Sequence, residues 1–559
     1  MGYSLCPLAS VCLIQDTGTL DVTTTTEQTA SAPPRASLSA MPGPELVFGL
    51  IGAVGTDLQW VSQSLSQHLQ RVGYASHEIR VSTLLHSLDR YALLTNPASR
   101  SEYERIRAHM QAGSELRRLA RSGDILALMC VAQIRRLRRE FARTDEEERS
   151  RTPLLRTAYI IRSIKHPSEI NALRDIYGRA FFVVSSYSPR GRRVSSLAAS
   201  IAESEGNPDH TSYRDRAEEL IRIDEDEGDQ TTLGQSVRDS FPQGDVFIDS
   251  RSRDRLNANL ERFIDAVFAN PFVTPTPDEF GMYHANSAAL RSADLGRQVG
   301  AAISTAEGDV IAIGCNDVPK AGGGLYWAGD DPDARDFRQG FDSAARFKSK
   351  IIGELSAKLL SAGWTPPAGC PGQPKALAEW MARDDAFKAT RLQNLLEYGR
   401  AVHAEMAAIT DAARRGISIK GATLYSTTFP CHLCARHIVS SGIARVVYIE
   451  PYTKSLAEEL YGDSVTVDAE DALETKVAFE PFVGISPGFY ELAFRLQPGS
   501  RKDPHGNAKD WVPRIAEPKL KHFASTYLSI EQKVLSAVLP EHFNRMGIHP
   551  VTRSGEHPS

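Results

Sequence analysis

One stretch of this 559-residue chain decides the fold of its second half: residues 402–452, VHAEMAAITDAARRGISIKGATLYSTTFPCHLCARHIVSSGIARVVYIEPY. Residues 402–416 and 431–442 have apolar side chains at helical spacing. Each of these segments precedes a strand-like run, at 422–430 and 444–452. Together with a predicted β-hairpin at 299–317, this order indicates a sheet with helices packed on it, an αβα layer.

Four residues in this stretch have the types and spacing of a catalytic metal centre. His403 and Glu405 lie in the first turn of one predicted helix. Cys431 and Cys434 lie at i and i+3 at the start of the next, where the helix dipole favours thiolates. One histidine and two cysteines are the three protein ligands of a catalytic zinc, which leaves a fourth position for water. Glu405 points elsewhere, so we expect it to move protons and not to bind metal.

The same residues predict the chemistry. A zinc ion lowers the pKa of bound water from 15.7 to about 7, and H-x-E followed by P-C-x-x-C is the signature of zinc nucleobase deaminases. The hydroxide would attack C4 of cytosine while Glu405 passes the proton to the ring nitrogen. The alternative, a structural zinc knuckle, needs a fourth ligand such as His432, His437 or a distant residue.

Outward from this stretch, the sequence predicts an α/β chain with two folded domains. Strands alternate with helices between residues 45 and 265, which indicates a mostly parallel sheet. Residues 1–44 end in a Thr-, Ser-, Ala- and Pro-rich run and are expected to be a disordered leader. A second domain is expected at 270–530 with a helical insertion at 335–400, followed by a C-terminal helix and tail at 531–559.

A glycine-rich loop follows the first predicted strand. The segment GLIGAVGT (49–56) stands between a strand and a helix, which is the context of a phosphate-binding loop. Val54 replaces the second glycine of that motif and Gly55 replaces its lysine, so the β/γ-phosphate charge lacks its usual neutraliser. The loop is either nucleotide-binding or a structural relic. The candidate nucleotide-binding residues are Gly49, Gly52, Gly55 and Thr56.

Acidic residues elsewhere in the first domain leave a further question open. Asp224 to Glu227, and Asp245 with Asp249, either coordinate Mg²⁺ beside such a nucleotide or are solvated loop charges.

The net charge, the cysteines and the length of apolar stretches limit the classes of function that the chain can have. The net charge of −5 gives no global basic field for nucleic acid. Seven scattered cysteines suggest reduced thiols in a cytoplasmic protein, and no apolar stretch is long enough to span a membrane.

Two further segments, RSADLGRQVGAAI (291–303) and GCNDVPKAGGGLYW (314–327), complete a family resemblance. With 402–452, they resemble the deoxycytidylate deaminases of the cytidine deaminase superfamily. With its P-loop kinase-like first domain, the chain is similar over about 45–530 to the bacterial antiphage cytidine deaminases. The resemblance implies Zn²⁺-dependent deamination of dCTP, dCMP or both, and defence against phage by nucleotide depletion. It also implies a homo-oligomer and an RNA or protein inhibitor.

The resemblance also supplies candidate substrate residues. It implies that Asn316 contacts the sugar. Ala407 stands where the family often has asparagine, which puts one substrate contact in doubt. Candidates for the phosphates or for packing around the base are Arg297, Lys320, Tyr452 and Lys454, although such side chains are commonly just solvated.

Two competing hypotheses remain. A polynucleotide deaminase acting on cytidine or adenosine in tRNA or single-stranded DNA shares the metal motif but usually needs a basic groove. A nucleotide-binding regulatory protein with a silent deaminase domain would not need Glu405, which is present.

Overall fold

The computed structural model describes residues 43–551 with internal gaps. These gaps are residues 96–100, 142–151, 226, 228–232, 367–368, 385–386, 388–389, 391, 393–397, 452–454, 469–474, 497–498 and 520–523. The leader predicted at 1–44 lies outside the described residues except for its last two positions.

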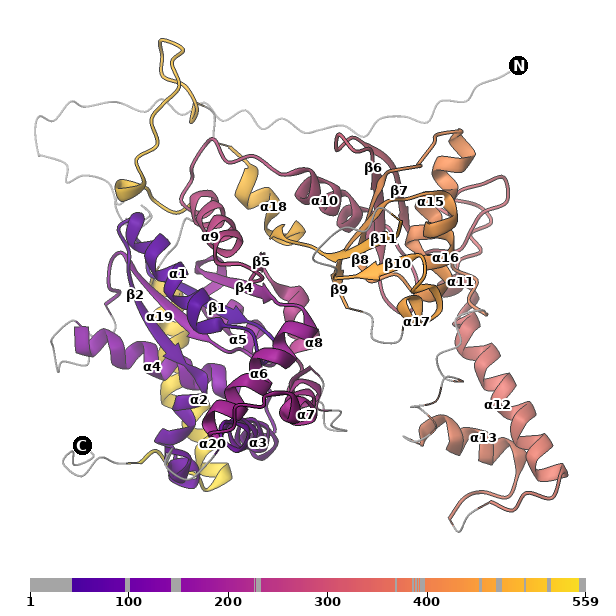
Figure 1. Ribbon diagram of the computed structural model, residues 1–559, viewed down its shortest axis with the longest axis horizontal. Helices are drawn as coiled ribbons and strands as arrows, with labels where there is room; N and C mark the ends of the chain where they lie inside the picture. Colours follow the sequence, from indigo (N-terminus) through magenta and orange to yellow (C-terminus); the bar gives the residue numbers. More distant parts are fainter. Residues whose placement is uncertain are drawn as a thin grey trace, which may run out of the picture. The chain divides into compact units, whose positions relative to one another are not determined.

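The first sheet has six strands in the order β12-β5-β4-β1-β3-β2. Strands β1, β2, β4 and β5 of this sheet are labelled in Figure 1. All neighbours are parallel except β12, which runs antiparallel to β5. Side chains of β1 alternate between two cores, because Val47 and Ile51 face one layer of helices and Phe48 and Leu50 the other. The predicted parallel α/β sheet is confirmed. Its strands are β1 (Leu46–Ile51), β2 (Ala75–Arg80), β3 (Thr157–Arg162), β4 (Phe181–Tyr187), β5 (Val246–Asp249) and β12 (Gly484–Ile485).

Helices cover both faces of this sheet. Between Glu102 and Phe141 the chain forms two helices, because Arg121 adopts a left-handed conformation with φ 50° and ends the first of them. The main helices of this region are α1 (Leu58–Arg71), α3 (Glu102–Ala120), α4 (Ile125–Phe141), α5 (Pro167–Tyr177), α6 (Arg190–Ser204), α7 (Arg214–Glu225) and α9 (Arg253–Val267).

The second sheet has the order β10-β11-β9-β8-β6-β7. One face packs on α15 and α16 and the other on α10, which gives the three layers that the sequence predicts. Strands β6 and β7 form the predicted antiparallel hairpin, and β8, β9, β11 and β10 are parallel. The strands are β6 (Gly300–Ser304), β7 (Val310–Cys315), β8 (Thr423–Thr428), β9 (Arg445–Glu450), β10 (Val465–Val467) and β11 (Val477–Pro481), and the helices are α10 (Pro277–Ala289), α15 (Ala404–Arg415) and α16 (His432–Ser441).

After the second sheet the chain returns to the first. Strand β12 pairs with β5, and α18 (Pro487–Phe494) adds Phe489 to the core around Phe182 and Phe263. Ile485, Phe489 and Tyr527, which lie in the range that the sequence places in the second domain, therefore pack with the first sheet. The reason is that short apolar segments there cover an otherwise open edge and face of that sheet.

A buried ionic network fixes the end of the chain. Arg138 of α4 contacts Glu45, and both its terminal nitrogens donate to Glu531 of α19 (Ala524–Lys533) at 2.6 and 2.8 Å. The hydroxyls of Tyr159 and Tyr527 donate to Glu45 at 2.9 and 2.7 Å. Helix α20 (Leu539–Met546) follows after the π-helical turn Val534–Val538.

The predicted helical insertion contains α11 (Asp336–Gln339), α12 (Ser343–Ser361) and α13 (Pro374–Arg383). Its own small core consists of Ile352, Leu377 and Met381. Among the helices that the structure describes, none combines the length and apolarity needed to span a bilayer.

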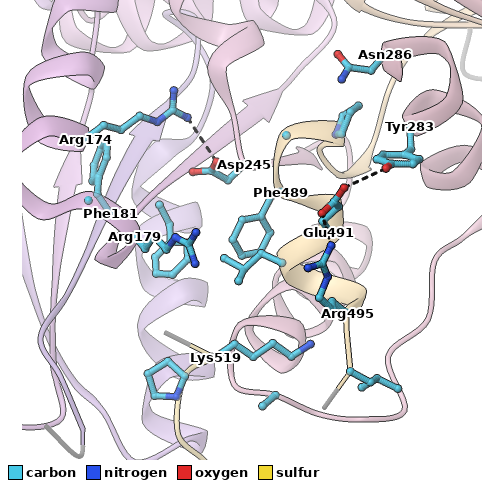
Figure 2. Close-up of a pocket in the computed structure, with 18 of the residues that line it drawn as sticks. Arg174, Arg179, Phe181, Asp245, Tyr283, Asn286, Phe489, Glu491, Arg495 and Lys519 are labelled. Atoms are coloured by element: carbon cyan, nitrogen blue, oxygen red, sulfur yellow. Dashed lines mark hydrogen bonds and ion pairs between the residues drawn. The ribbon is translucent and has the colours of Figure 1, made fainter. Parts of the chain in front are cut away.

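A cavity of about 1170 Å³ lies where α10, α18 and the first sheet meet. Figure 2 shows Arg174 beside Asp245 on one side of it and Tyr283 beside Glu491 on the other. Phe489 and Lys519 also line it. Both basic and acidic side chains line its wall.

Candidate metal centre

The end of the β6–β7 hairpin fixes where the ligand-bearing helix α15 begins. Asp317 and Val402 exchange backbone hydrogen bonds, with N–O distances of 2.9 and 3.3 Å. His403, the next residue, is the N-cap of α15 and has extended backbone angles of φ −67° and ψ 154°. Glu405 then lies in the first turn of the helix. The hairpin and the helix start are therefore held together beside Asn316.

A glycine allows α15 to lie directly on β7. A Cβ at Gly314 would be 2.3 Å from the carbonyl oxygen of Ala404 and 2.4 Å from the backbone nitrogen of Ala408. Any side chain at this position would push the helix, and with it His403, away from the sheet.

The two cysteines stand at the start of the neighbouring helix. Cys431 is the N-cap of α16, and Cys434 lies in its first turn. Both are buried, with 6% and 3% of their surface exposed. The backbone N–H of Ala435 donates to the Cys431 carbonyl at 2.9 Å, which begins the helix at this point. Both sulfur atoms thus face the positive end of a helix dipole.

The three side chains fit a zinc ion. His403 Nδ1 lies 3.3 Å from Cys431 Sγ and 3.4 Å from Cys434 Sγ. Ligands sharing one tetrahedral zinc at normal bond lengths have N···S separations of about 3.6 Å. The candidate ligand atoms of these three residues all lie within 4.8 Å of one another. Among the described residues, no fourth His, Cys, Asp or Glu joins this group. Three protein ligands are the number found in catalytic zinc sites.

Neither neighbouring histidine supplies a fourth ligand in the described part of the chain. His432 and His437 lie on α16 but are not in the ligand group. The ligand set that the sequence predicts therefore comes together in space, while the structural-knuckle alternative gains no support.

The charges at the centre are tightly coupled. Hydrogen bonding from Cys434, and then from His403, lowers the pKa of Cys431 to about 4. The hydrogen bond to Cys431 raises the pKa of His403 to about 9 despite burial. Cys434 shows the opposite shift, since its hydrogen bond to Cys431 and its burial raise its pKa. This pocket thus stabilises thiolate at Cys431, the form of cysteine that binds metal.

Glu405 lies beside the ligands without joining them. It is 4% exposed, and its Oε2 lies 3.5 Å from Cys434 Sγ. Burial raises the pKa of Glu405, which favours a carboxyl group that can hold a proton. This placement suits a proton carrier next to the open ligand position.

Asn316 is part of the scaffold next to the metal ligands. Its Oδ1 accepts from the Val299 N–H at 2.7 Å, and its Nδ2 donates to the Arg297 carbonyl at 2.8 Å. It is 8% exposed. These bonds fix the segment before β6, and contact with a sugar stays a prediction for the remaining hydrogen-bonding capacity of its side chain.

The other predicted substrate residues lie at the surface or outside the described residues. Arg297 Nη1 lies 3.4 Å from Glu450, and Lys320 Nζ lies 2.7 Å from Asp330. Tyr452 and Lys454 lie outside the residues that the structure describes. Their roles stay predictions.

Reasoning from the sequence did not single out Asp317. This residue is 2% exposed, accepts from the Val318 N–H at 2.7 Å and bridges to the residue before His403. Its burial raises its pKa. In the sequence, only the position directly after Asn316 points to Asp317, because its bridge partner Val402 lies more than eighty positions away.

The predicted nucleotide-binding glycines have separate packing roles. Gly49 lies inside β1, where a Cβ would meet Ile164 Cδ1 at 2.5 Å. A Cβ at Gly52 would lie 2.8 Å from Leu58 Cδ2. Gly55 has φ 88°, a conformation that favours glycine. Thr56 donates its N–H to Ala53 and closes the turn.

The acidic residues considered for Mg²⁺ are engaged with other groups. Asp249 pairs with Arg251 and Arg255, and Asp245 accepts from the Val183 N–H and pairs with Arg174. Asp224 contacts Lys165. Magnesium binding stays an untested expectation.

The segment that carries the metal centre is similar to known proteins. Residues 275–450 match a family model described as the cytidine and deoxycytidylate deaminase zinc-binding region. The deoxycytidylate deaminase of Enterobacteria phage T2 is 54% identical over 54 residues, which are 10% of this chain and 29% of the phage protein. ComE operon protein 2 of Bacillus subtilis (strain 168) is 41% identical over 71 residues, 12% of this chain and 38% of that protein. The chain thus matches less than two fifths of either relative.

Among solved structures, the apo dCMP deaminase of cyanophage S-TIM5 is 16% identical, with a TM-score of 0.20. That match covers 37% of this chain and 99% of the phage chain. These sequence matches and the ligand geometry support a cytidine and deoxycytidylate deaminase zinc-binding region within residues 275–450.

Proposed function

We propose that this chain is a zinc-dependent deaminase that converts the cytosine of a free deoxycytidine nucleotide, dCMP or dCTP, to uracil. The observation that carries the proposal is the convergence of His403, Cys431 and Cys434 beside the buried carboxyl group of Glu405. Water is consumed and ammonia is released, so the site must move a proton from water to the base.

Glu405 is the group that moves this proton. His403, Cys431 and Cys434 would hold the zinc ion, which would supply a nucleophile at neutral pH by lowering the pKa of water. The Glu405 carboxylate accepts the proton of that water, delivers it to the ring nitrogen and assists the departure of ammonia. Its burial excludes bulk water, which would compete for the proton.

A deoxycytidine nucleotide is favoured by the family description and by the name of the phage T2 relative, a deoxycytidylate deaminase. By resemblance, Asn316 would contact the sugar and Arg297 or Lys320 the phosphates. Both cations pair with carboxylates at the surface, so phosphate would have to compete with Glu450 or Asp330 for them.

The test is an ammonia-release assay on the full-length protein with dCMP, dCTP, CTP and a cytosine-containing single-stranded oligonucleotide. We expect turnover of a free deoxycytidine nucleotide. E405Q should retain about one zinc per chain and lose about 10²–10⁴-fold in kcat, because a carboxamide cannot accept the proton. D411N, the same chemical change on the exposed side of α15, is the matched control and should keep wild-type turnover.

Two outcomes would contradict the proposal. Turnover of the oligonucleotide alone would show a polynucleotide deaminase. Undiminished activity of E405Q would reject Glu405 as the proton carrier.

The proposed biological role is defence against phage by depletion of deoxycytidine nucleotides, under an RNA or protein inhibitor. This role is supported by the resemblance of the chain, in which a deaminase domain is joined to a P-loop-like domain, to the bacterial antiphage cytidine deaminases. Bacteria expressing the wild-type chain should plate phage with lower efficiency than bacteria expressing E405Q. Equal plating would contradict this role but would leave the enzymatic proposal intact.

A further inference from the structure

Helix α10 has two faces with different surroundings. One face lies directly on the second sheet, because a Cβ at Gly300 of β6 would lie 1.9 Å from the carbonyl oxygen of Ala285. Four residues on another face follow one another at i, i+3, i+4 and i+7, the spacing of a single helical stripe. All four line the cavity of about 1170 Å³ described above, and they are Tyr283, Asn286, Ser287 and Leu290. The cavity therefore borders the helix that carries the second sheet.

Much of the remaining wall is aromatic. Phe181 and Phe182 begin β4, and Phe489 comes from α18. The rings of Phe182 and Phe489 meet edge to face, with their centroids 5.8 Å apart. Aromatic walls favour a flat apolar ring, which they contact edge to face or by offset stacking. Small-molecule sites commonly enclose about 300–1,000 Å³, so this cavity has room for such a ring and its polar substituents.

Three carboxylates line the wall, and each has a cation of the chain as its partner. The pairs are Asp245 with Arg174, Glu491 with Arg495, and Glu517 with Arg156. Burial also raises the pKa of Asp245 to about 6, so this carboxyl group carries less negative charge near neutral pH than an exposed aspartate does. The negative charge of the wall is thus compensated from within the chain.

Two cations of the wall lack a carboxylate partner among the described residues. Arg179 follows α5, and its exposed side chain makes no ion pair or hydrogen bond with this part of the chain. Lys519 donates to the Ala493 carbonyl but pairs with no carboxylate. Burial lowers the pKa of Lys519, as expected for an ammonium group that no anion compensates. Figure 2 shows Arg179, Phe489 and Lys519 bordering the cavity.

We propose that this cavity binds a small aromatic anion with two negative charges, such as an aryl phosphate or an aromatic dicarboxylate. The ring lies against Phe489 and the neighbouring phenylalanines, and the anionic groups accept from Arg179 and Lys519. The amide of Asn286 offers a further donor from α10. Neither the three metal ligands nor Glu405 line the cavity, so the site is separate from the metal centre.

Charge and ring must act together, which distinguishes a built site from solvated side chains. An exposed arginine is commonly only hydrated, and it then holds a simple anion weakly. A ligand with the charge but no ring leaves the aromatic wall without a contact, whereas a ring without charge leaves Arg179 and Lys519 uncompensated. Each partial ligand should therefore bind at least about tenfold more weakly than the complete one.

The experiment measures binding of naphthyl phosphate and of naphthalene dicarboxylate to the full-length chain by isothermal titration calorimetry. Inorganic phosphate and naphthol are the two partial ligands. R179M should bind naphthyl phosphate about tenfold or more weakly than wild type, because a charge-assisted hydrogen bond is lost. R139M, the same change at an exposed arginine of α4 outside the cavity, is the matched control and should bind like wild type.

A second variant tests the cavity without changing its charges. S287W leaves every charged side chain in place but fills the space beside α10 with an indole, so it should also lose binding. E405Q should bind the probe like wild type, and dCMP should not displace it, because the cavity shares no residue with the metal centre. These results do not depend on the proposed deaminase function.

The outcomes against the proposal are equally definite. Failure of both complete ligands to bind with a Kd below about 1 mM would overturn it. So would equal affinity of R179M and wild type, undiminished binding by S287W, or displacement of the probe by dCMP. Tighter binding of the phosphate or of the dicarboxylate supports the proposal and identifies which of the two anionic groups the site takes.

Discussion

Asp245 shows at the scale of one residue how burial outweighs local partners. It accepts from the Val183 N–H at 2.7 Å and lies 3.4 Å from Arg174, yet burial raises its pKa from 3.8 to about 6. The folded chain thus binds this proton more tightly than the unfolded chain does. The contribution of Asp245 to stability is therefore full below about pH 4 and is lost as the pH rises through 6.

D245N cannot titrate, so its stability relative to wild type should improve as the pH rises from 4.5 to 7.5, by an amount equivalent to about 2 kcal/mol. Thermal unfolding midpoints of both proteins across this range provide the measurement. D254N, the same chemical change at an exposed aspartate on α9, is the matched surface control. A pH-independent difference for D245N would contradict the argument.

At the scale of elements, the contact between β7 and α15 sets the position of the metal ligands. Gly314 faces backbone atoms of α15 at distances that leave no room for a methyl group. G314A should therefore displace the helix, cost about 1–3 kcal/mol of stability and weaken zinc retention. Zinc content after dialysis against a mild chelator gives the readout.

The control for this substitution is I313A on the same strand, because Ile313 is 49% exposed and faces away from α15. It should keep wild-type zinc content. Normal zinc retention by G314A would show that the sheet can yield and that helix placement does not depend on this glycine.

The network around Arg138 joins α4 to α19. R138M would leave the carboxylates of Glu45 and Glu531 buried without their cation. Losing one partner of a buried ionic group costs about 3–5 kcal/mol, so we expect a large fall in the unfolding midpoint and faster proteolysis of the C-terminal helices. R139M, one position away and exposed, should change neither.

Elements with local signals were predictable from the sequence, and those set by distant contacts were not. His403 and Cys431 each precede a periodic helix, so their helices and their shared ligand role could be inferred from spacing. Strand β12 has two residues and no periodicity, and Lys165 meets the glycine loop across 113 positions. No sequence pattern predicts strand β12 or the contact of Lys165 with the loop, because both depend on the order of strands that are distant in sequence.

At the scale of the whole molecule, the region that matches the family model is not a complete sheet. Residues 275–450 end with β9, whose edge pairs with β11 in the full chain. A fragment of 275–450 should expose this edge and lose Phe479 from the core, so it should aggregate or bind a hydrophobic dye. A fragment of 275–483 should behave better in the same dye assay. Equal behaviour of the two would contradict the prediction.

The return of the chain to the first sheet also affects its synthesis on the ribosome. Strand β5 emerges early, but Tyr527, which completes the network around Glu45, is 527 − 246 = 281 positions later than the first residue of β5. At about 5–20 residues per second, the nascent N-terminal half waits roughly 15–60 s for this partner. During that interval its apolar surface is open to solvent, which makes this half a natural client for chaperones that bind emerging polypeptides.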